Sequence, residues 1–577
     1  MLWPARIPTV TATDTTSVRT TRGVEIAARD LWRSVKGGRN VLCGVSLTIR
    51  PRELVAVVGG SGAGKTTLLE ALAGVRPAQR GSVRFNGVDL YGNLDTLRRL
   101  LGYVPQDDII HADLPLERTL RYAAALRLPP SSSAVEVDAA VEQALASLGL
   151  TERADVQVGP LSGGQRKRAS IAVELLTSPD VFFLDEPTSG LDPASAGELL
   201  TLLRGLADSG STVVFTTHSV QDLQTCDRVV FLARDGHLAF DGTIPEALAY
   251  FGVERIEEIY GLLEWESTPE AWAQRFTEHR SDGADAALDG AVQAPAPRER
   301  IGFWAEWSVL TRRTLETLVR NRLTLAILLG SPALIVAMFA VLFRPGAFDF
   351  DHPIPSSIQM IVFWITFAAF FFGLTYGLLQ IVTEQAILRR EALVGQRLSA
   401  YLLSKVAVLL PFLVFVVVLM LAVLRALDRM PPASTTTYVS VGVTLSLLAA
   451  SALALGLMTS AAVSNPAQAT LALPMLCFPA VLFSGAILPV HVMAGAGAAL
   501  STIISDRWAF EALGHDLGIR HILSDGGSSL GPPLLDAYGD AGTRATGFYW
   551  LLLAAFTIVF FVGAWLILRR RTRTATR

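Results

Sequence analysis

Charged residues are scarce in this 577-residue chain, at 18% of the total, and they are missing altogether from long stretches of its second half. No Asp, Glu, Lys or Arg occurs between residues 430 and 505. Hydrophobic residues make up 51% of the chain, and the mean hydropathy is +0.42. This composition excludes an ordinary soluble globular protein, although the residues before about 300 have the balance of one by themselves.

Cysteine is also rare, with Cys43, Cys226 and Cys477 far apart in the chain. This number and spacing predict neither a disulfide framework nor a metal cluster. The net charge of −3 gives no indication of a nucleic-acid partner. The N-terminus lacks the apolar core of a signal peptide and repeats threonine between Thr9 and Thr21, so we expect residues 1–23 to form a disordered tail.

The uncharged stretches are long enough to cross a membrane, which takes roughly 20 apolar residues. A Ser-Asn-Pro sequence at 464–466 divides the longest of them into two. The sequence therefore predicts six spans, at residues 323–343, 358–382, 406–424, 438–463, 468–488 and 548–568.

Basic residues orient these spans, because loops on the cytoplasmic side carry an excess of Lys and Arg. We expect the chain to lie in the cytoplasmic membrane with both termini in the cytoplasm. Residues 493–547 are then expected outside. The basic residues concerned follow the second and sixth spans: Arg389, Arg390, Arg397, Lys405, Arg569, Arg570, Arg571, Arg573 and Arg577.

Composition changes divide the chain further. We expect a soluble domain at 24–263, an Ala- and Pro-rich linker at 264–300, and a membrane domain at 323–577. Residues 301–322 between them predict an amphipathic helix with tryptophan and arginine. Such a helix lies on the membrane surface or packs on the soluble domain, and the sequence leaves both open.

A glycine-rich loop follows a short apolar run at 55–58, and residues 66–75 then favour a helix. This strand–loop–helix context predicts a phosphate-binding loop of the Walker A type. Lys65 is expected to reach the β- and γ-phosphates of ATP, and the Thr66 hydroxyl to bind Mg²⁺. The residues predicted to contact ATP here are Gly59, Gly60, Ser61, Gly62, Ala63, Gly64, Lys65, Thr66 and Thr67.

Two carboxylates follow a second apolar run at 181–184, and a third such run lies at 213–215. Fully apolar runs of this length are typical of strands in a parallel sheet. At the end of such a strand, Asp185 is predicted to hold Mg²⁺ and Glu186 to act as the general base toward water.

The sequence Leu-Ser-Gly-Gly-Gln at 161–165 resembles the signature motif of ATP-binding cassette proteins. Gln106, Asp192 and His218 are similar to that family's Q-loop, D-loop and switch residues, in the same order. The resemblance implies an α/β P-loop ATPase domain followed by an all-helical membrane domain. It also implies that Gln106 contacts Mg²⁺ and the membrane domain, and that His218 holds the γ-phosphate. Further ATP contacts are implied for Ser162, Gly163, Gly164, Gln165 and Asp192.

One position departs from the family pattern. The family stacks an aromatic side chain on adenine before the Walker A loop, and the matching position here is Val35. Trp32 is the alternative that the sequence leaves open.

The domain order resembles the G-type half-transporters, whose membrane domain is of the ABC-2 type. The stretch from Glu384 to Glu391 is similar to the acid-bounded loop before that group's coupling helix. The resemblance implies that Phe372 lines a substrate cavity and that Ile487, after a Phe-Ser-Gly run, closes its outer end.

These features predict a bacterial exporter that works as a dimer by alternating access, with a second copy of the chain or a similar half-transporter as partner. The cargo is expected to be small and amphipathic or lipid-like, because no predicted span carries a fixed charge. A polysaccharide or glycolipid exporter stays open as an alternative. So does an ATPase that regulates membrane components without moving a solute.

Overall fold

The computed structural model describes residues 23–35, 37–265, 267–281 and 301–576. The predicted tail at 1–23 lies outside them except for its last residue, and so does most of the predicted linker at 264–300. The chain forms two compact units. Among the described residues, the first unit contains those in 23–74, 78–106 and 178–281, and the second contains 75–77, 107–177 and 301–576.

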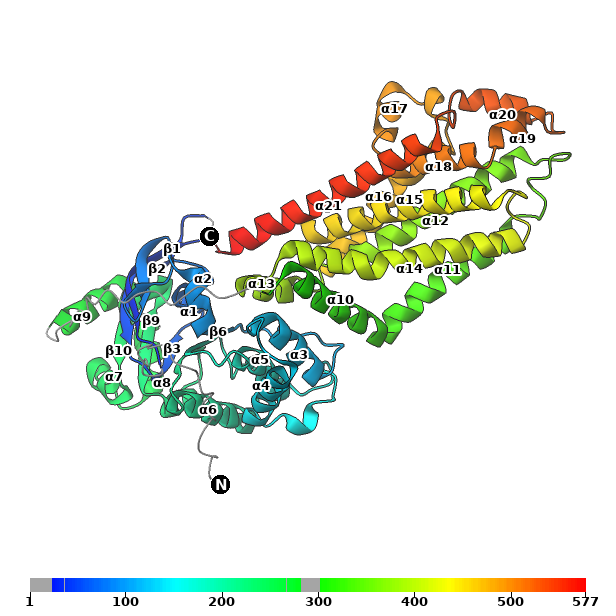
Figure 1. Ribbon diagram of the computed structural model, residues 1–577. Coiled ribbons are helices and arrows are strands. Elements are labelled where there is room, and N and C mark those ends of the chain that lie inside the picture. The colour runs from blue at the N-terminus through cyan, green and yellow to red at the C-terminus, as the bar shows by residue number, and fades with distance from the viewer. Residues whose placement is uncertain (1–22, 36, 266, 282–300, 577) are drawn as a thin grey trace. The chain divides into compact units, whose positions relative to one another are not determined.

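A six-stranded sheet is the centre of the first unit, with the order β10-β9-β3-β8-β7-β6 (Figure 1). Neighbouring strands are parallel except for β10 and β9. Every residue of β3, β7 and β8 is buried, which explains why these strands are apolar without alternation. The three predicted strands are therefore confirmed. The bounds are β3 Leu54–Gly59, β6 Leu101–Val104, β7 Val181–Leu184, β8 Thr212–Thr217, β9 Arg228–Ala233 and β10 His237–Gly242.

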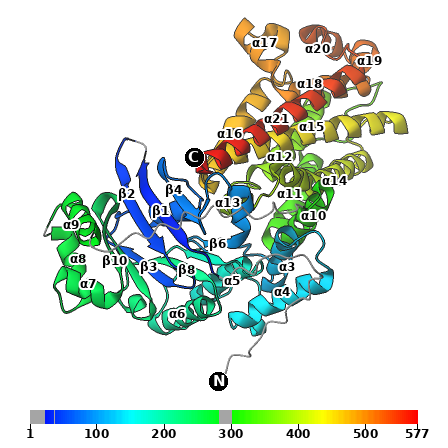
Figure 2. The same cartoon turned by 60° about the vertical axis from the view of Figure 1, so that its left-hand side comes forward.

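A second, antiparallel sheet has the order β2-β1-β4-β5 (Figure 2). Its strands alternate more between buried and partly exposed residues, as expected when only one face of a sheet is covered. The bounds are β1 Ile26–Ser34, β2 Asn40–Ile49, β4 Arg80–Phe85 and β5 Val88–Asp89.

Helices complete the first unit, and the last of them corrects a predicted boundary. Helix α9 occupies 269–281, inside the predicted linker, and its Trp272 and Phe276 are 2% and 5% exposed. Because these two aromatic residues are buried, the folded part extends beyond residue 263. The Ala- and charge-rich composition around them had indicated a linker. The bounds are α1 Lys65–Leu72, α2 Leu94–Leu97, α6 Pro193–Asp208, α7 Ile244–Phe251, α8 Ile256–Trp265 and α9 Pro269–Ser281.

The second unit combines three helices from the predicted ATPase domain with all the helices after residue 301. The first three are α3 Leu116–Arg127, α4 Ala134–Ser147 and α5 Gly163–Leu175. The predicted connecting helix is α10, Phe303–Arg320, which packs against α3 and α14. Its Trp304 is 72% exposed, so one face is packed against protein and the other is open.

Five helices among the described residues are long and apolar enough to cross a membrane. They correspond to the first four predicted spans and the sixth. The predicted fifth span, 468–488, is wrong in length: α16 ends at Leu482 after 17 residues and contains Pro474 and Pro479. The bounds are α11 Arg322–Leu342, α12 Pro355–Leu378, α13 Gln385–Leu393, α14 Leu398–Ala426, α15 Thr435–Ala462, α16 Pro466–Leu482 and α21 Thr546–Thr576.

Four short helices lie between α16 and α21, at the end of the bundle away from α13 (Figure 1). One of them, α18, packs against α12, α15 and α21, and its Asp506 is completely buried. The predicted external segment is therefore a folded cap that reaches into the bundle. The bounds are α17 Gly495–Ser501, α18 Ser505–Asp516, α19 Ile519–Asp525 and α20 Gly531–Tyr538.

Candidate functional site

The phosphate-binding loop joins β3 to α1, as predicted. Gly64 is the N-cap of α1 and has a φ of 92°, in the left-handed region that glycine adopts without strain. A Cβ atom at this position would lie 2.4 Å from the Val41 carbonyl oxygen. Both the positive φ and the short distance to Val41 require glycine at this position. Without a side chain here, the loop can pack directly against strand β2.

Lys65 is buried at the start of α1 and is held by the loop itself. Its ammonium donates to the carbonyl oxygens of Gly59 at 2.9 Å and Gly60 at 3.1 Å. Burial lowers the pKa of Lys65, while the nearby carboxylates of Glu186 and Asp185 oppose that shift. The amine therefore lies between the loop and the two acids that follow β7.

Asp185 and Thr66 meet at this point. The Thr66 hydroxyl donates to a carboxylate oxygen of Asp185 at 3.1 Å, and the Thr216 hydroxyl donates to the same oxygen at 2.6 Å. Hydroxyl and carboxylate oxygens are the ligands that Mg²⁺ prefers, and it usually takes only one or two from the protein. Thr66 and Asp185 thus fit a nucleotide-bound Mg²⁺.

Glu186 is the residue on which Gln106, predicted to contact Mg²⁺, and His218, predicted to be catalytic, converge. Its backbone N–H donates to the Thr216 hydroxyl at 2.8 Å, and its φ is 43°. Gln106 donates to one carboxylate oxygen at 3.1 Å, and the His218 Nδ1 lies 3.7 Å from the other. A non-glycine residue at positive φ, fixed by neighbours, is a feature that clusters at functional sites.

The 161–165 motif forms the N-terminus of α5 in the second unit. The Ser162 hydroxyl accepts from the Gln165 N–H at 3.3 Å, and the Gln165 side chain accepts from the Ser162 N–H at 3.1 Å. This capping box leaves Gly163 and Gly164 in the first turn of a 13-residue helix. Backbone N–H groups at the positive end of a helix suit a phosphate ligand.

Asp192 caps a different helix. Its carboxylate accepts from the backbone N–H groups of Ala194 and Ser195 and from the Ser195 hydroxyl, and so begins α6. The structure therefore gives Asp192 a structural role in the loop after Glu186. Its predicted contact with ATP stays a prediction.

The two candidates for adenine stacking differ in their surroundings. The Trp32 indole N–H donates to Asp30 at 2.6 Å, and its ring lies where a Cβ on Gly44 would touch it at 3.4 Å. Val35 is 47% exposed. Trp32 is thus held within the small sheet, and Val35 is the more accessible of the two.

The acid-bounded stretch is anchored at both ends within the second unit. Glu384 accepts from the Lys405 ammonium at 2.7 Å and from the Tyr401 hydroxyl at 2.8 Å. Glu391 forms a two-bond ion pair with Arg313 of α10, one bond of which measures 2.9 Å. The two acids predicted for coupling therefore fix α13 to α14 and to α10.

Arg390 supplies a contact that the sequence interpretation missed. Its guanidinium donates to Glu174 of α5 at 2.9 and 2.7 Å, and to the Ser170 and Ile109 carbonyl oxygens at 3.0 and 2.8 Å. Arg127 of α3 binds the other Glu174 oxygen at 2.8 Å. Burial alone would raise the pKa of Glu174, but the two arginines outweigh it and hold that pKa below its usual value.

The signal for this cluster was present in the sequence but ambiguous. Arg390 stands beside Arg389 between two acids, and the positive-inside rule already accounts for basic residues in such a loop. Glu174 lies in an otherwise apolar helical turn, where a charge needs a partner. The pairing of the two residues could be seen only in three dimensions.

Phe372, the residue predicted to line a substrate cavity, is buried in the subunit, and its cavity role stays a prediction. Its side chain is 1% exposed and lies 6.1 Å from the ring of Tyr376 inside the subunit. The accessible stripe of α12 contains Trp364, Phe367 and Phe371, which follow one another at helical spacing with rings 5.8 and 6.1 Å apart. Phe372 and this stripe therefore lie on different faces of α12.

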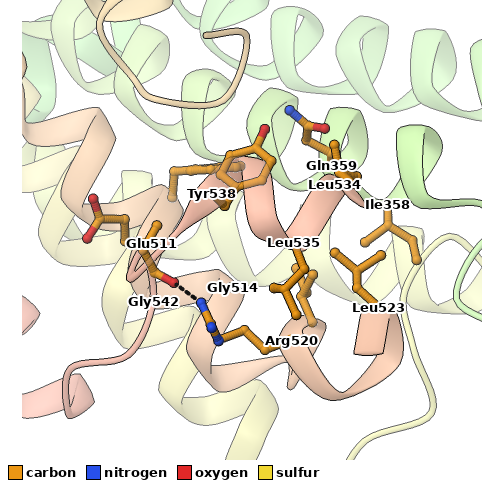
Figure 3. Close-up of a pocket in the computed structure, with 13 residues that line it drawn as sticks. Ile358, Gln359, Glu511, Gly514, Arg520, Leu523, Leu534, Leu535, Tyr538 and Gly542 are labelled. Atoms are coloured by element: carbon orange, nitrogen blue, oxygen red, sulfur yellow. Dashed lines mark hydrogen bonds between the residues drawn. The ribbon is translucent and has the colours of Figure 1, made fainter. Parts of the chain in front are cut away.

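Ile487 lies at the surface, 52% exposed, and the residue before it is tied down. The Ala486 carbonyl oxygen accepts from Gln359 of α12 and, at 2.6 Å, from the Tyr538 hydroxyl of α20. Figure 3 shows Gln359 and Tyr538 side by side at a cavity of about 60 Å³ between α12, α18, α19 and α20. The predicted closing segment is thus held by both the bundle and the cap.

Two family models match the chain. Residues 42–189 match the ABC transporter model, and residues 305–514 match the ABC-2 type transporter model. These ranges contain the phosphate loop, the 161–165 motif, most of α10 and the stretch from Glu384 to Glu391. The two halves of the chain therefore carry the two domain types that the motifs predicted.

Two of three curated relatives match about two thirds of the chain, and the third matches a shorter stretch. The chain is 35% identical over 400 residues to the ABC transporter ATP-binding/permease protein Rv1747 of Mycobacterium tuberculosis, covering 67% of this chain and 45% of that protein. It is 30% identical over 434 residues to ABC transporter G family member 6 of Arabidopsis thaliana, covering 65% of this chain and 58% of that protein. It is 39% identical over 228 residues to G family member 26 of the same plant, covering 38% and 33%.

The chain thus spans between about a third and three fifths of the length of these relatives. The fold class predicted from the sequence, an α/β ATPase domain followed by an all-helical membrane domain, is confirmed. With its ATP-binding part first and its membrane part second, the chain belongs to the ABC transporters with an ABC-2 type membrane domain.

Proposed function

We propose that this chain is one half of an ATP-driven exporter. The observation that carries the proposal is the buried contact between Arg390 of α13 and Glu174 of α5. Helix α5 begins with the 161–165 motif, and α13 connects the spans α12 and α14. A movement of the motif would therefore be passed to two spans through a charged, hydrogen-bonded joint.

The chemical step proposed is hydrolysis of the terminal phosphoanhydride of ATP. Glu186 accepts a proton from a water molecule, the water oxygen bonds to the γ-phosphorus, and the bond to the bridging oxygen breaks, so ADP and phosphate leave. Lys65 and His218 would bind the γ-phosphate, and the contact between Gln106 and Glu186 keeps the base at the site. Mg²⁺ held by Thr66 and Asp185 would neutralise charge on the phosphates.

Each ATP would be enclosed by the Walker A loop of one copy and the 161–165 motif of a second copy. Every motif of the site occurs once in this chain, so two copies supply two sites. The N–H groups of Gly163 and Gly164 at the start of α5 supply the positive end of a helix for the γ-phosphate. When the two copies close on ATP, α5 would move and α13 would move with it. The spans would then open the cargo site to one side of the membrane and close it to the other.

The proposed cargo is a small amphipathic or lipid-like molecule moved out of the cytoplasm. The accessible aromatic stripe of α12 offers an apolar surface for it, in Trp364, Phe367 and Phe371. Helix α16 adds exposed apolar side chains at helical spacing, Leu471, Met475 and Phe478. Neither stripe carries a charge, which favours a cargo with a large apolar part.

Uptake by inverted membrane vesicles tests the proposal. With ATP, vesicles containing the chain should accumulate amphipathic fluorescent probes, and Glu186→Gln should abolish both accumulation and phosphate release. The loss expected on removing such a base is about 10²–10⁴-fold. The substitution keeps the shape of the side chain, and nucleotide binding should persist as a control.

Two outcomes would contradict the export proposal. Equal accumulation with Glu186→Gln would show that hydrolysis at this site does not drive transport. Hydrolysis without accumulation of any probe would favour an ATPase that acts on membrane components.

A further inference from the structure

A groove of about 720 Å³ runs between α14 and α15 on the surface of the bundle. Its walls are apolar side chains from both helices, among them Val418 and Val439, which are 56% and 60% exposed. The groove lies on faces that the other described helices of the bundle leave uncovered, so in a membrane its content is lipid or a lipid-like molecule.

The depth of the groove comes from small residues along its floor. Gly442, Ala422 and Ala450 lie where bulky side chains would fill the space between the two helices. A Cβ added to Gly442 would meet only Leu421, at 3.9 Å. The Ser446 hydroxyl in this groove donates to the Gly442 carbonyl oxygen at 2.7 Å, so it presents little polarity to a ligand.

One end of the groove is cationic. Arg425, in the last turn of α14, lines that end together with Thr435 and Tyr438 at the start of α15. Its guanidinium is exposed and donates to the Met430 carbonyl oxygen at 3.4 Å, which leaves other N–H groups of the fork for a ligand. None of the described lining residues is acidic.

The groove is longer than one leaflet is thick, and so is long enough for an acyl chain. From Arg425 to Leu410 the helix rises about 22 Å, at about 1.5 Å per residue, whereas half of the hydrocarbon core is about 15 Å. An acyl chain whose headgroup lies at Arg425 can therefore lie along the groove within one leaflet. That leaflet is the one remote from α13.

We propose that this groove binds an anionic phospholipid, with its phosphate on Arg425 and an acyl chain along the α14–α15 seam. Guanidinium groups bind phosphate through paired hydrogen bonds, and a net positive site favours a headgroup with net negative charge. The site is separate from the ATP site and does not depend on the proposed export function.

Native mass spectrometry of the purified full-length chain tests the proposal. The protein in detergent is mixed with phosphatidylglycerol or phosphatidylcholine of identical acyl chains, and the lipids retained are counted. The wild type should retain phosphatidylglycerol about fivefold better, the value expected for one arginine near an anionic headgroup. Arg425→Gln should remove this preference.

Matched variants locate the lipid. Arg344→Gln removes an exposed arginine that follows α11 at the same end of the bundle, and it should leave the preference unchanged. Gly442→Leu and Ala422→Leu fill the floor from opposite helices and should reduce retention of both lipids. Ala422 is exposed, so a larger side chain there should not disturb folding. The Ala422→Leu variant therefore tests the effect of filling the groove even if Gly442→Leu fails to fold.

Three results would overturn the proposal. The first is that Arg425→Gln keeps the preference for phosphatidylglycerol. The second is that Arg344→Gln loses this preference to the same extent as Arg425→Gln, which would indicate an effect of general surface charge. Retention could also stay at the wild-type level when Ala422→Leu fills the floor, which would place the lipid elsewhere.

Discussion

At the scale of single residues, the side chain of His111 has a pKa set by its burial and by the charged groups around it. It is 8% exposed, and its Nε2 has no hydrogen-bond partner among the described residues. Burial and Arg313 of α10 lower the pKa of His111 to about 4, against the opposing effect of Glu384 and Glu391 at the two ends of α13. Lys405 of α14 also disfavours the charged form, so the imidazole is neutral at pH 7.

This lowered pKa predicts acid sensitivity. The unfolded chain binds a proton at His111 below about pH 6.5, whereas the folded chain does not until about pH 4, so stability falls as the pH falls through this window. The loss is on the order of 3 kcal/mol in total. Thermal unfolding of the chain in detergent, followed from pH 7 to pH 4, measures it.

His111→Gln is the matched variant, because glutamine keeps a polar side chain and does not titrate. Its unfolding midpoint should fall less between pH 6.5 and pH 5 than that of the wild type, and the remaining fall includes His237, whose pKa is also lowered by burial. The pKa of Glu384 is about 2, since Lys405, His111 and Arg313 outweigh the effect of burial, and that carboxyl therefore titrates below this window. Equal slopes for the variant and the wild type would contradict a neutral His111.

Residues in motifs were predictable from the sequence because backbone geometry fixes their spacing. The phosphate loop must turn between a strand and a helix, and Gly64 marks that turn. Phe372 had no such constraint, because successive residues of a helix differ in direction by about 100° and the sequence does not fix which of them faces a cavity. In the structure Phe371 is partly exposed and Phe372 is buried, and the cavity role of Phe372 stays a prediction.

At the scale of elements, α13 is a short helix fixed by three ion pairs to three different helices. Arg390 binds α5, Glu391 binds α10, and Glu384 binds Lys405 of α14. Each charge is deeply placed, so removing one partner leaves the other uncompensated, at a cost of about 3–5 kcal/mol. Helix α13 therefore moves with its neighbours as a unit.

Arg390→Lys tests this joint. Lysine keeps the charge but loses the forked geometry that binds Glu174 and two carbonyl oxygens at once. ATP hydrolysis should stay within about twofold of the wild type, while probe accumulation per ATP falls about tenfold, as expected for 1–2 kcal/mol of lost coupling. Both rates are measured in the same vesicles.

Arg389→Lys is the control for this change, because Arg389 is the neighbouring arginine and is exposed. It should leave the ratio of transport to hydrolysis unchanged. A parallel loss of hydrolysis and accumulation in Arg390→Lys would indicate a folding defect and would contradict a coupling role.

At the scale of the whole molecule, hydropathy identified the spans but not the cap. Residues 430–505 lack charge, yet α16 ends at Leu482, where the Phe-Ser-Gly sequence begins. The next charge, Asp506, lies in the segment predicted to be external, and α18 buries it beside Thr366 of α12. A window average cannot detect such a helix, since its burial depends on the helices around it.

The proposed dimer also belongs to this scale, and complementation between two inactive chains tests it. Lys65→Ala damages the Walker A loop, and Gly164→Asp places a negative charge at the start of α5, where the γ-phosphate is expected. Either variant alone gives a dimer with two defective sites. A mixed dimer combines both defects in one site and leaves the other intact.

Coexpression of the two variants should therefore restore hydrolysis that neither shows alone. With random pairing, half of the dimers are mixed and each keeps one of its two sites, so about a quarter of the wild-type activity returns if the sites are independent. The restored activity should elute at about twice the 62.0 kDa chain mass, after correction for detergent. If the Walker A loop and the 161–165 motif of one chain formed a site together, each variant would inactivate its own site. Mixing the two variants would then restore no hydrolysis.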